Sequence, residues 1–354
     1  MSRGWIGGTA VALCALLAGC DPVEKGAPPG QGAPQASPDL RAQLQARLEI
    51  CPAQQQPAKS LCAAGELAAL SREAAGVLAQ EAALLSPEGR RLMIENQAEW
   101  ARMELQVCAL SASASLTAPI CMQRALTERL RNADQAVQAI GGYVIQRMER
   151  LAAVPVPQTQ QGESDFGAPV AATRISWPRI DAPPGAKAAR FNEVASELPP
   201  SGRELIDTTV DFAVAYAGPT LMSVQFTTYT YAPGAAHPGG GAEALNFLMG
   251  AGRMLEPEDV FRADTDWQNF LVNRAAAGLA DVFAEFGEPP GPELLRDAVT
   301  KPRLWVIGET GLTLLFPPYA LGGPWALGAQ EVRIGWAELQ PYLRPDAPAP
   351  FGSS

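Results

Sequence analysis

The sequence contains a single histidine and has fewer basic than acidic residues. One histidine excludes zinc sites built from several histidines, and no C-x2-C pair is present to supply a thiolate site instead. With 27 Lys and Arg against 37 Asp and Glu, the formal net charge is −10. Nucleic-acid binding is therefore not expected, because nothing would neutralise the phosphates. Beyond the N-terminus no apolar run approaches the roughly 20 residues that span a bilayer.

Apolar residues, in contrast, are plentiful. The 354-residue chain is 47% hydrophobic, which excludes disorder of the whole chain because large apolar surfaces can be buried. At about 150 residues per domain, the length predicts roughly two domains. The 33 glycines and 32 prolines place a large share of the chain in turns and linkers.

The N-terminus predicts export. An apolar run over residues 5–17 follows Arg3 and is typical of a secretory signal peptide. It ends in Leu17-Ala18-Gly19-Cys20, which resembles the bacterial lipobox. That resemblance implies removal of residues 1–19 and diacylation of Cys20, which would anchor the protein in the membrane. We expect a cell-envelope lipoprotein that faces the periplasm, in the inner or the outer membrane, with residues 20–42 as a flexible tether.

The remaining cysteines are even in number. Cys14 leaves with the signal peptide, so two disulfides are expected in an oxidising compartment; the cysteines concerned are Cys51, Cys62, Cys108 and Cys121.

Residues 43–151 are rich in helix-forming residues with apolar side chains at helical spacing. Ser86 followed by Pro87 predicts a helix start, with helices before it, from it to about residue 110, and over about 120–150. In such a hairpin Cys62 and Cys108 lie at the same height, which favours Cys62–Cys108 and Cys51–Cys121 pairing.

After a polar linker at 152–172 the hydrophobic period changes to that of strands. A strand is expected at 221–231, where residues 223–229 alternate as a half-buried strand does. Further strands are expected at 175–180, 208–217, 245–249, 304–307, 312–316 and 331–334, with helices at 186–198, 266–286 and 292–298. The fold class is therefore α+β. A small disulfide-linked all-helical domain precedes an α+β domain with a mainly antiparallel sheet at 173–346, and 347–354 form a tail.

Residues 43–151 resemble the LprI-type domain, named for a lysozyme-inhibiting lipoprotein. The resemblance rests on the four cysteines, Leu67, Leu70, Gln97-x2-Trp100-x7-Cys108 and Arg129. The chain departs from that pattern at Ala58, Ser71 and Glu104. The resemblance implies the helical fold and a lysozyme-like partner.

Residues 173–346 resemble the extracellular domain of RsiV, an anti-sigma factor that senses lysozyme. Its motifs here are Tyr231-x2-Gly234-x2-His237-Pro238, Gly252-Arg253-x-Leu255-x3-Asp259-x-Phe261, and Phe316-x2-Tyr319 followed by Gly328 and Val332-x-Ile334. The chain lacks the transmembrane helix and sigma-binding segment of RsiV, so sigma-factor control is not expected.

Catalysis, a cofactor and a bound metal are not expected. A hydrolase would need His237 as a base, with Ser223 and Asp211 as the available partners, but no nucleophile motif is present. His237 and the following Gly239–Gly241 run instead predict a turn.

Two groups of residues are candidates for contact with a partner protein. The first is an acidic cluster. Its alternatives are a solvated surface and a calcium loop, although the spacing of the acidic residues does not match that of an EF-hand. The second is a Pro/Gly-rich loop with two aromatic residues, which would otherwise pack on the sheet. The candidates are Glu256, Glu258, Asp259, Asp264 and Asp266 for the cluster, and Tyr319 and Trp325 for the loop.

We therefore expect a lipid-anchored envelope protein that binds or inhibits a basic, lysozyme-like muramidase. The alternative is a non-enzymatic module that binds peptidoglycan or senses envelope stress. The acidic charge of the chain favours a basic partner.

Overall fold

The computed structural model describes residues 38–51, 65–111, 117–157, 159, 169–199, 202, 205–233, 235–286 and 289–351. Cys20, Cys62 and Gly234, with the predicted signal peptide and most of the tether, lie outside these ranges. Within them, no helix is long and apolar enough to cross a membrane.

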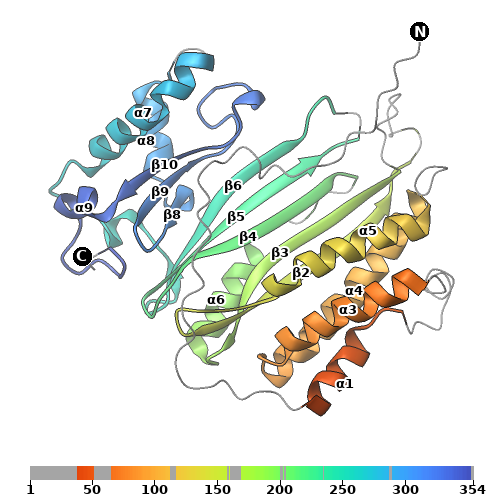
Figure 1. Ribbon diagram of the computed structural model, residues 1–354. Helices are drawn as coiled ribbons and strands as arrows, with labels where there is room; N and C mark the ends of the chain where they lie inside the picture. Colours follow the sequence, from red (N-terminus) through yellow and green to blue (C-terminus); the bar gives the residue numbers. More distant parts are fainter. Residues whose placement is uncertain are drawn as a thin grey trace, which may run out of the picture. The chain divides into compact units, whose positions relative to one another are not determined.

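The described chain begins with helices, as the composition predicts (Figure 1). They are α1 (Pro38–Leu48), α3 (Gly65–Ala82), α4 (Pro87–Leu110) and α5 (Ala118–Arg131). The predicted start of α4 is confirmed: the Ser86 hydroxyl accepts a hydrogen bond from the Gly89 N–H at 3.1 Å, and Pro87 holds the first helical position.

The helix expected over 120–150 is wrong beyond Arg131. The chain instead forms β1 (Val137–Ile140) and β2 (Tyr143–Pro155), which pair as an antiparallel hairpin. Gly141 and Gly142 form its two-residue turn with φ of 58° and 83°, a conformation that favours glycine. A Cβ on Gly141 would lie 1.8 Å from the Ala217 carbonyl oxygen. The Gly-Gly turn therefore overrides the helical composition around it.

Strand β2 also crosses the expected boundary into the 152–172 linker. It pairs with β3 (Val170–Ala182) up to Pro155. The helical segment and the α+β segment are thus joined by a shared sheet, because the strand that follows α5 belongs to it.

The seven-stranded sheet has the order β1-β2-β3-β4-β5-β6-β7. Its remaining members are β4 (Asp207–Ala217), β5 (Leu221–Tyr231), β6 (Gly239–Leu248) and β7 (Arg253–Met254). Only the β3–β4 pair is parallel among these described strands, and α6 (Ala186–Glu197) makes the crossover that a parallel pair requires. The expected α+β class with a mainly antiparallel sheet is confirmed.

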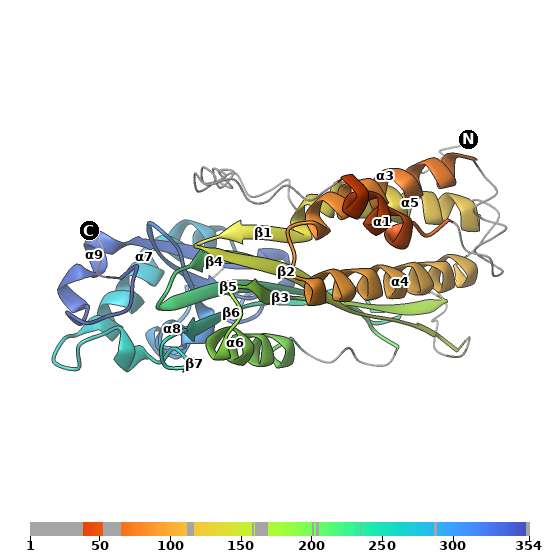
Figure 2. The same cartoon turned by 90° about the horizontal axis from the view of Figure 1, so that it is seen from below.

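Opposite faces of β3 carry different partners (Figure 2). Ile175 lies in one core cluster with Phe191 of α6, whereas its neighbour Arg174 bonds Glu104 of α4. Successive side chains of a strand point to opposite faces, so α6 and α4 cover the two sides of the sheet.

The C-terminal part packs on β5 and β6. It comprises α7 (Trp267–Phe286), α8 (Pro292–Val299), α9 (Trp336–Leu339) and a three-stranded sheet of β8 (Trp305–Ile307), β9 (Gly311–Phe316) and β10 (Gln330–Gly335). Two buried polar residues attach it: Ser223 accepts the Ile307 N–H at 3.0 Å, and the Asn246 amide donates to the Trp305 carbonyl at 2.7 Å.

The expected tail at 347–354 is packed where it is described. Phe351 is 1% exposed, and its ring lies 4.9 Å from that of Trp336. The hydrophobic ring is buried because the C-terminal core offers it an aromatic partner.

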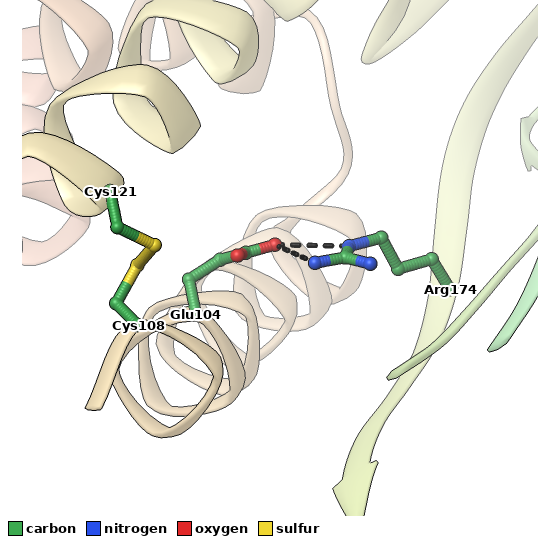
Figure 3. The surroundings of a disulfide bond; sticks show 4 residues. All are labelled: Glu104, Cys108, Cys121 and Arg174. Carbon is green, nitrogen blue, oxygen red and sulfur yellow. Dashed lines mark hydrogen bonds and ion pairs between the residues drawn. A yellow bond between two sulfur atoms is a disulfide. The ribbon is translucent and has the colours of Figure 1, made fainter. Parts of the chain in front are cut away.

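The expected pairing of the cysteines is wrong. Cys108 is bonded to Cys121 across the α4–α5 connection, with 5.5 Å between the Cα atoms (Figure 3). Cys51 is disulfide-bonded as well. The hairpin of α3 and α4 does not decide the pairing, because α5 also packs beside α4. Cys108 lies in the last turn of α4, and α5 folds back beside it, which brings Cys121 within bonding distance.

The start of α4 is fixed to the sheet by one carboxylate. Asp181 of β3 accepts the Ser86 N–H at 2.6 Å and the Ser86 hydroxyl at 2.7 Å, and Arg179 bonds it at 2.7 Å. Burial raises the pKa of Asp181, but the hydrogen bonds from Ser86 and Arg179 outweigh it, so the pKa is lowered overall. The ionised carboxylate also lies at the positive end of the helix dipole.

The first prediction concerns the space beside Asp181. A Cβ on Gly89 would lie 2.5 Å from the Asp181 Oδ1 atom, whereas one on Gly76 of α3 meets only Gln45, at 3.6 Å. Chemical denaturation should show Gly89→Ala less stable than the parent by about 1–3 kcal/mol. Gly76→Ala, the control, should be more stable by up to about 1 kcal/mol. Equal effects of the two substitutions would contradict this packing.

The second prediction concerns pH. Because the folded pKa of Asp181 is lowered, its carboxylate stabilises the fold at neutral pH, and this contribution is lost as the pH falls through the folded pKa. The free energy of unfolding of Asp181→Asn should therefore be about 1–3 kcal/mol lower than that of the parent at pH 7. The difference from the parent should shrink below about pH 4. A difference that stays constant over a series of denaturation curves from pH 7 to pH 3 would refute this role.

Candidate functional site

Two chain connections that are distant in the sequence meet in an aromatic cluster, formed by His237, Tyr319 and Trp325. His237 lies between β5 and β6, and the other two lie between β9 and β10. The His237 and Trp325 rings stack with centroids 5.4 Å apart and planes 13° apart. The Tyr319 hydroxyl lies 3.2 Å from His237 Nε2. The structure therefore brings His237 together with the two loop residues, which the sequence had singled out apart from it.

The cluster is held by its own loops and remains accessible. His237 Nδ1 lies 2.8 Å from the Pro238 carbonyl oxygen, and the Tyr231 hydroxyl donates to the Ala235 carbonyl at 3.3 Å. Tyr319 has a φ of 67° and is 53% exposed. A large, half-exposed aromatic side chain with a fixed position is the type of residue that anchors protein interfaces.

A groove of about 480 Å³ adjoins the cluster. Gly240 lines the groove and lies next to the cluster, because a Cβ at this position would lie 3.3 Å from the Trp325 ring. Burial raises the pKa of the Glu243 carboxyl in the groove, and the charge of Arg303 opposes this. The groove is thus lined by residues with hydroxyl, carboxyl and guanidinium groups, namely Thr208, Thr228, Thr230, Glu243 and Arg303.

Sequence reasoning missed this groove. The Gly239–Gly241 run was expected to be a hairpin turn, but it opens β6 and pairs with Thr228–Thr230. Glycine there leaves room for Trp325. The threonines at 227, 228 and 230 were visible in the sequence, but the pairing of residues 228–230 with a glycine run was not.

The acidic cluster is internally compensated. Arg253 pairs with Asp259 at 2.7 Å and Arg262 with Asp264 at 2.9 Å. Arg253 lowers the pKa of Asp259, chiefly through its hydrogen bonds, and Arg262 does the same for Asp264.

The other members have local roles. Asp266 accepts hydrogen bonds from the Asn269 amide at 2.7 and 2.9 Å, and Glu256 begins a short 3-10 helix that contains Glu258. In the described ranges no group of histidine, cysteine and acidic side chains is arranged to hold a metal ion. The cluster therefore presents less unbalanced charge than its composition implies.

The residues of the hydrolase alternative are engaged elsewhere. Ser223 is buried and bonds the Ile307 N–H, and Asp211 pairs with Arg147 at 2.7 Å. The contacts of His237 are with Tyr319, Trp325 and Pro238.

No protein-family model and no curated protein matches the chain, so the LprI-type and RsiV-type resemblances stay predictions. Its structural neighbours are DUF3298 family proteins. One from Pseudomonas aeruginosa PAO1 has 14% identity and a TM-score of 0.41, and one from Bacteroides fragilis NCTC 9343 has 15% identity and a TM-score of 0.37. Each alignment covers 58% of this chain and 96% of the other.

The third prediction tests the contact between groove and cluster. Gly240→Ala adds a methyl group 2.9 Å from the Thr228 carbonyl oxygen and 3.3 Å from Trp325, whereas Gly241→Ala meets nothing within 4 Å. In an NMR spectrum of the indole N–H groups, the Trp325 resonance should shift in Gly240→Ala and stay in place in Gly241→Ala. An unmoved Trp325 resonance in Gly240→Ala would contradict the contact.

Proposed function

We propose that this protein is a non-enzymatic, lipid-anchored protein of the cell envelope that binds a lysozyme-like muramidase. The aromatic cluster of His237, Tyr319 and Trp325 is the anchor of the contact, and Cys20 carries the lipid. The observation that carries the proposal is the meeting of these aromatic residues from two separate loops, with Tyr319 53% exposed.

Physical reasoning supports an anchor at this place. Tyrosine and tryptophan at the centre of an interface contribute a large share of binding energy, because they bury much area at small conformational cost. The stacking of Trp325 on His237 orders the rings before binding, which reduces the entropy lost on association. The −10 net charge of the chain favours approach of a basic protein.

The compensated acidic cluster refines the expected role of charge. Since Asp259 and Asp264 already pair with arginines, the electrostatic contribution comes from the net charge of the chain rather than from these side chains. It should therefore act on the association rate and weaken with added salt.

A second candidate is binding of the glycan strands of peptidoglycan. It is favoured by the groove, where threonine hydroxyls, Glu243 and Arg303 lie beside the aromatic cluster. A pocket with a few polar groups beside apolar surface is suited to fix the orientation of a small polar ligand.

The fourth prediction measures the anchor. Tyr319→Ala and Trp325→Ala should each weaken binding to a c-type lysozyme by about 30-fold or more in calorimetry or surface plasmon resonance, corresponding to the loss of about 2 kcal/mol. Leu84→Ala is the control, because Leu84 is a 49% exposed apolar residue of the helical segment. This variant should bind like the parent.

Sedimentation with purified sacculi separates the candidates. Lysozyme binding that depends on Tyr319, with the protein left in the supernatant, supports the first. Sedimentation that Tyr319→Ala abolishes, without lysozyme binding, supports the second. Failure to bind c-type, g-type and i-type lysozymes as well as sacculi overturns both.

A further inference from the structure

A second cavity is lined by residues between 78 and 211, which precede the aromatic cluster in the sequence. It has a volume of about 650 Å³, is partly open to solvent, and is lined by residues of α3, α4 and α5 and of β2, β3 and β4. Small-molecule sites in proteins have volumes of about 300–1,000 Å³. The cavity is therefore large enough for a ligand rather than for a single water.

Its walls are built from side chains that hold one another in place. Arg129 of α5 bonds Glu149 of β2 at 2.8 and 2.9 Å and Gln97 of α4 at 3.1 Å, and it stacks over Trp100 at 5.2 Å. These bonds fix the distance between the helices and the sheet.

Two further arginines fix the floor. Arg147 bonds Ser176 at 2.6 Å and Asp211 at 2.7 Å, and Arg174 reaches Glu104 at 2.9 and 3.0 Å, as Figure 3 shows. A site with such mutually bonded walls is ordered before any ligand enters.

Three groups in the lining are left without protein partners in the described part of the chain. The amide nitrogen of Asn96 has no hydrogen-bond partner, although Asn96 is only 8% exposed. Arg124 and Glu128, one turn apart on α5, are exposed and have no ion pair with a described residue. A buried donor without a partner costs free energy, so a bound acceptor would relieve it.

The charges of the lining define the chemistry of such a ligand. Arg124, Arg129, Arg147 and Arg174 are balanced by Glu104, Glu128, Glu149 and Asp211. A strongly anionic or cationic ligand would therefore gain little. A zwitterionic ligand would place its anionic group near Arg124, a hydrogen-bond acceptor near Asn96 and its cationic group near Glu128.

We propose that this cavity binds a zwitterionic, peptide-like small molecule. Its carboxylate pairs with Arg124, a carbonyl oxygen accepts from Asn96, and its ammonium group pairs with Glu128. The proposal is independent of the lysozyme-binding proposal, because it involves none of the residues of the aromatic cluster.

The fifth prediction is tested by calorimetry on the full chain with tri-alanine as the probe. The parent should bind it with saturable heat, and N-acetyl-tri-alanine amide, which lacks both charges, should bind at least about tenfold more weakly. Free alanine, titrated in parallel, distinguishes a site for amino acids from one for peptides. Absence of saturable heat up to about 10 mM with both tri-alanine and alanine would overturn the proposal.

Matched variants locate the site. Arg124→Gln should raise the dissociation constant about tenfold. Arg102→Gln, which changes an exposed arginine of α4 outside the cavity lining, should leave it unchanged.

Asn96→Leu is the second variant. It should weaken binding while leaving the thermal midpoint equal or higher, because it removes an unsatisfied buried group. Tyr319→Ala should bind tri-alanine like the parent, which separates this result from the lysozyme test. Equal affinities of the parent, Arg124→Gln and Asn96→Leu would overturn the assignment.

Discussion

The attachment of α4 to the sheet through Asp181 is the interaction on which the helical layer depends. A single carboxylate of β3 accepts both hydrogen bonds from Ser86 and one from Arg179. Beside it, the Gln146 amide donates to the Gly89 carbonyl at 2.8 Å. The close approach requires glycine at position 89, so the first turn of α4 combines a cap, a charge and a steric constraint in one place.

The far end of α4 is attached differently. There Glu104, near the disulfide, bonds Arg174 of β3. Between the two ends, Trp100 contacts Arg129 of α5, which bonds Glu149 of β2, and these residues line the 650 Å³ cavity. Isolated ion pairs on a protein surface contribute little to stability. Here the charged side chains have partners on three elements, so their geometry is specific even where their net energy is small.

The aromatic cluster is built in another way. Two loops, each with turn hydrogen bonds of its own, meet through their aromatic rings, and the glycine at position 240 leaves space for Trp325. A scaffold of strands holds the loops, and the loops hold the exposed Tyr319. The division between a rigid support and an exposed anchor is common in proteins that bind partners.

Local features of this protein could be predicted from its sequence, because they follow from interactions between near neighbours. They include the Ser86-Pro87 helix start, the helical composition before residue 131, the alternation in 223–229 and the α+β class. Tyr319 and Trp325 were also singled out as one loop and His237 as a turn residue, but not as a single cluster. The β2 strand was missed because its Gly141-Gly142 turn stood among helix-forming residues. Long-range features emerged only in the folded chain: which cysteines meet, the burial of Phe351, the stacking of Trp325 on His237, and the cavity that Asn96 lines. Each of these depends on contacts between residues far apart in the chain, which hydrophobic periodicity does not encode.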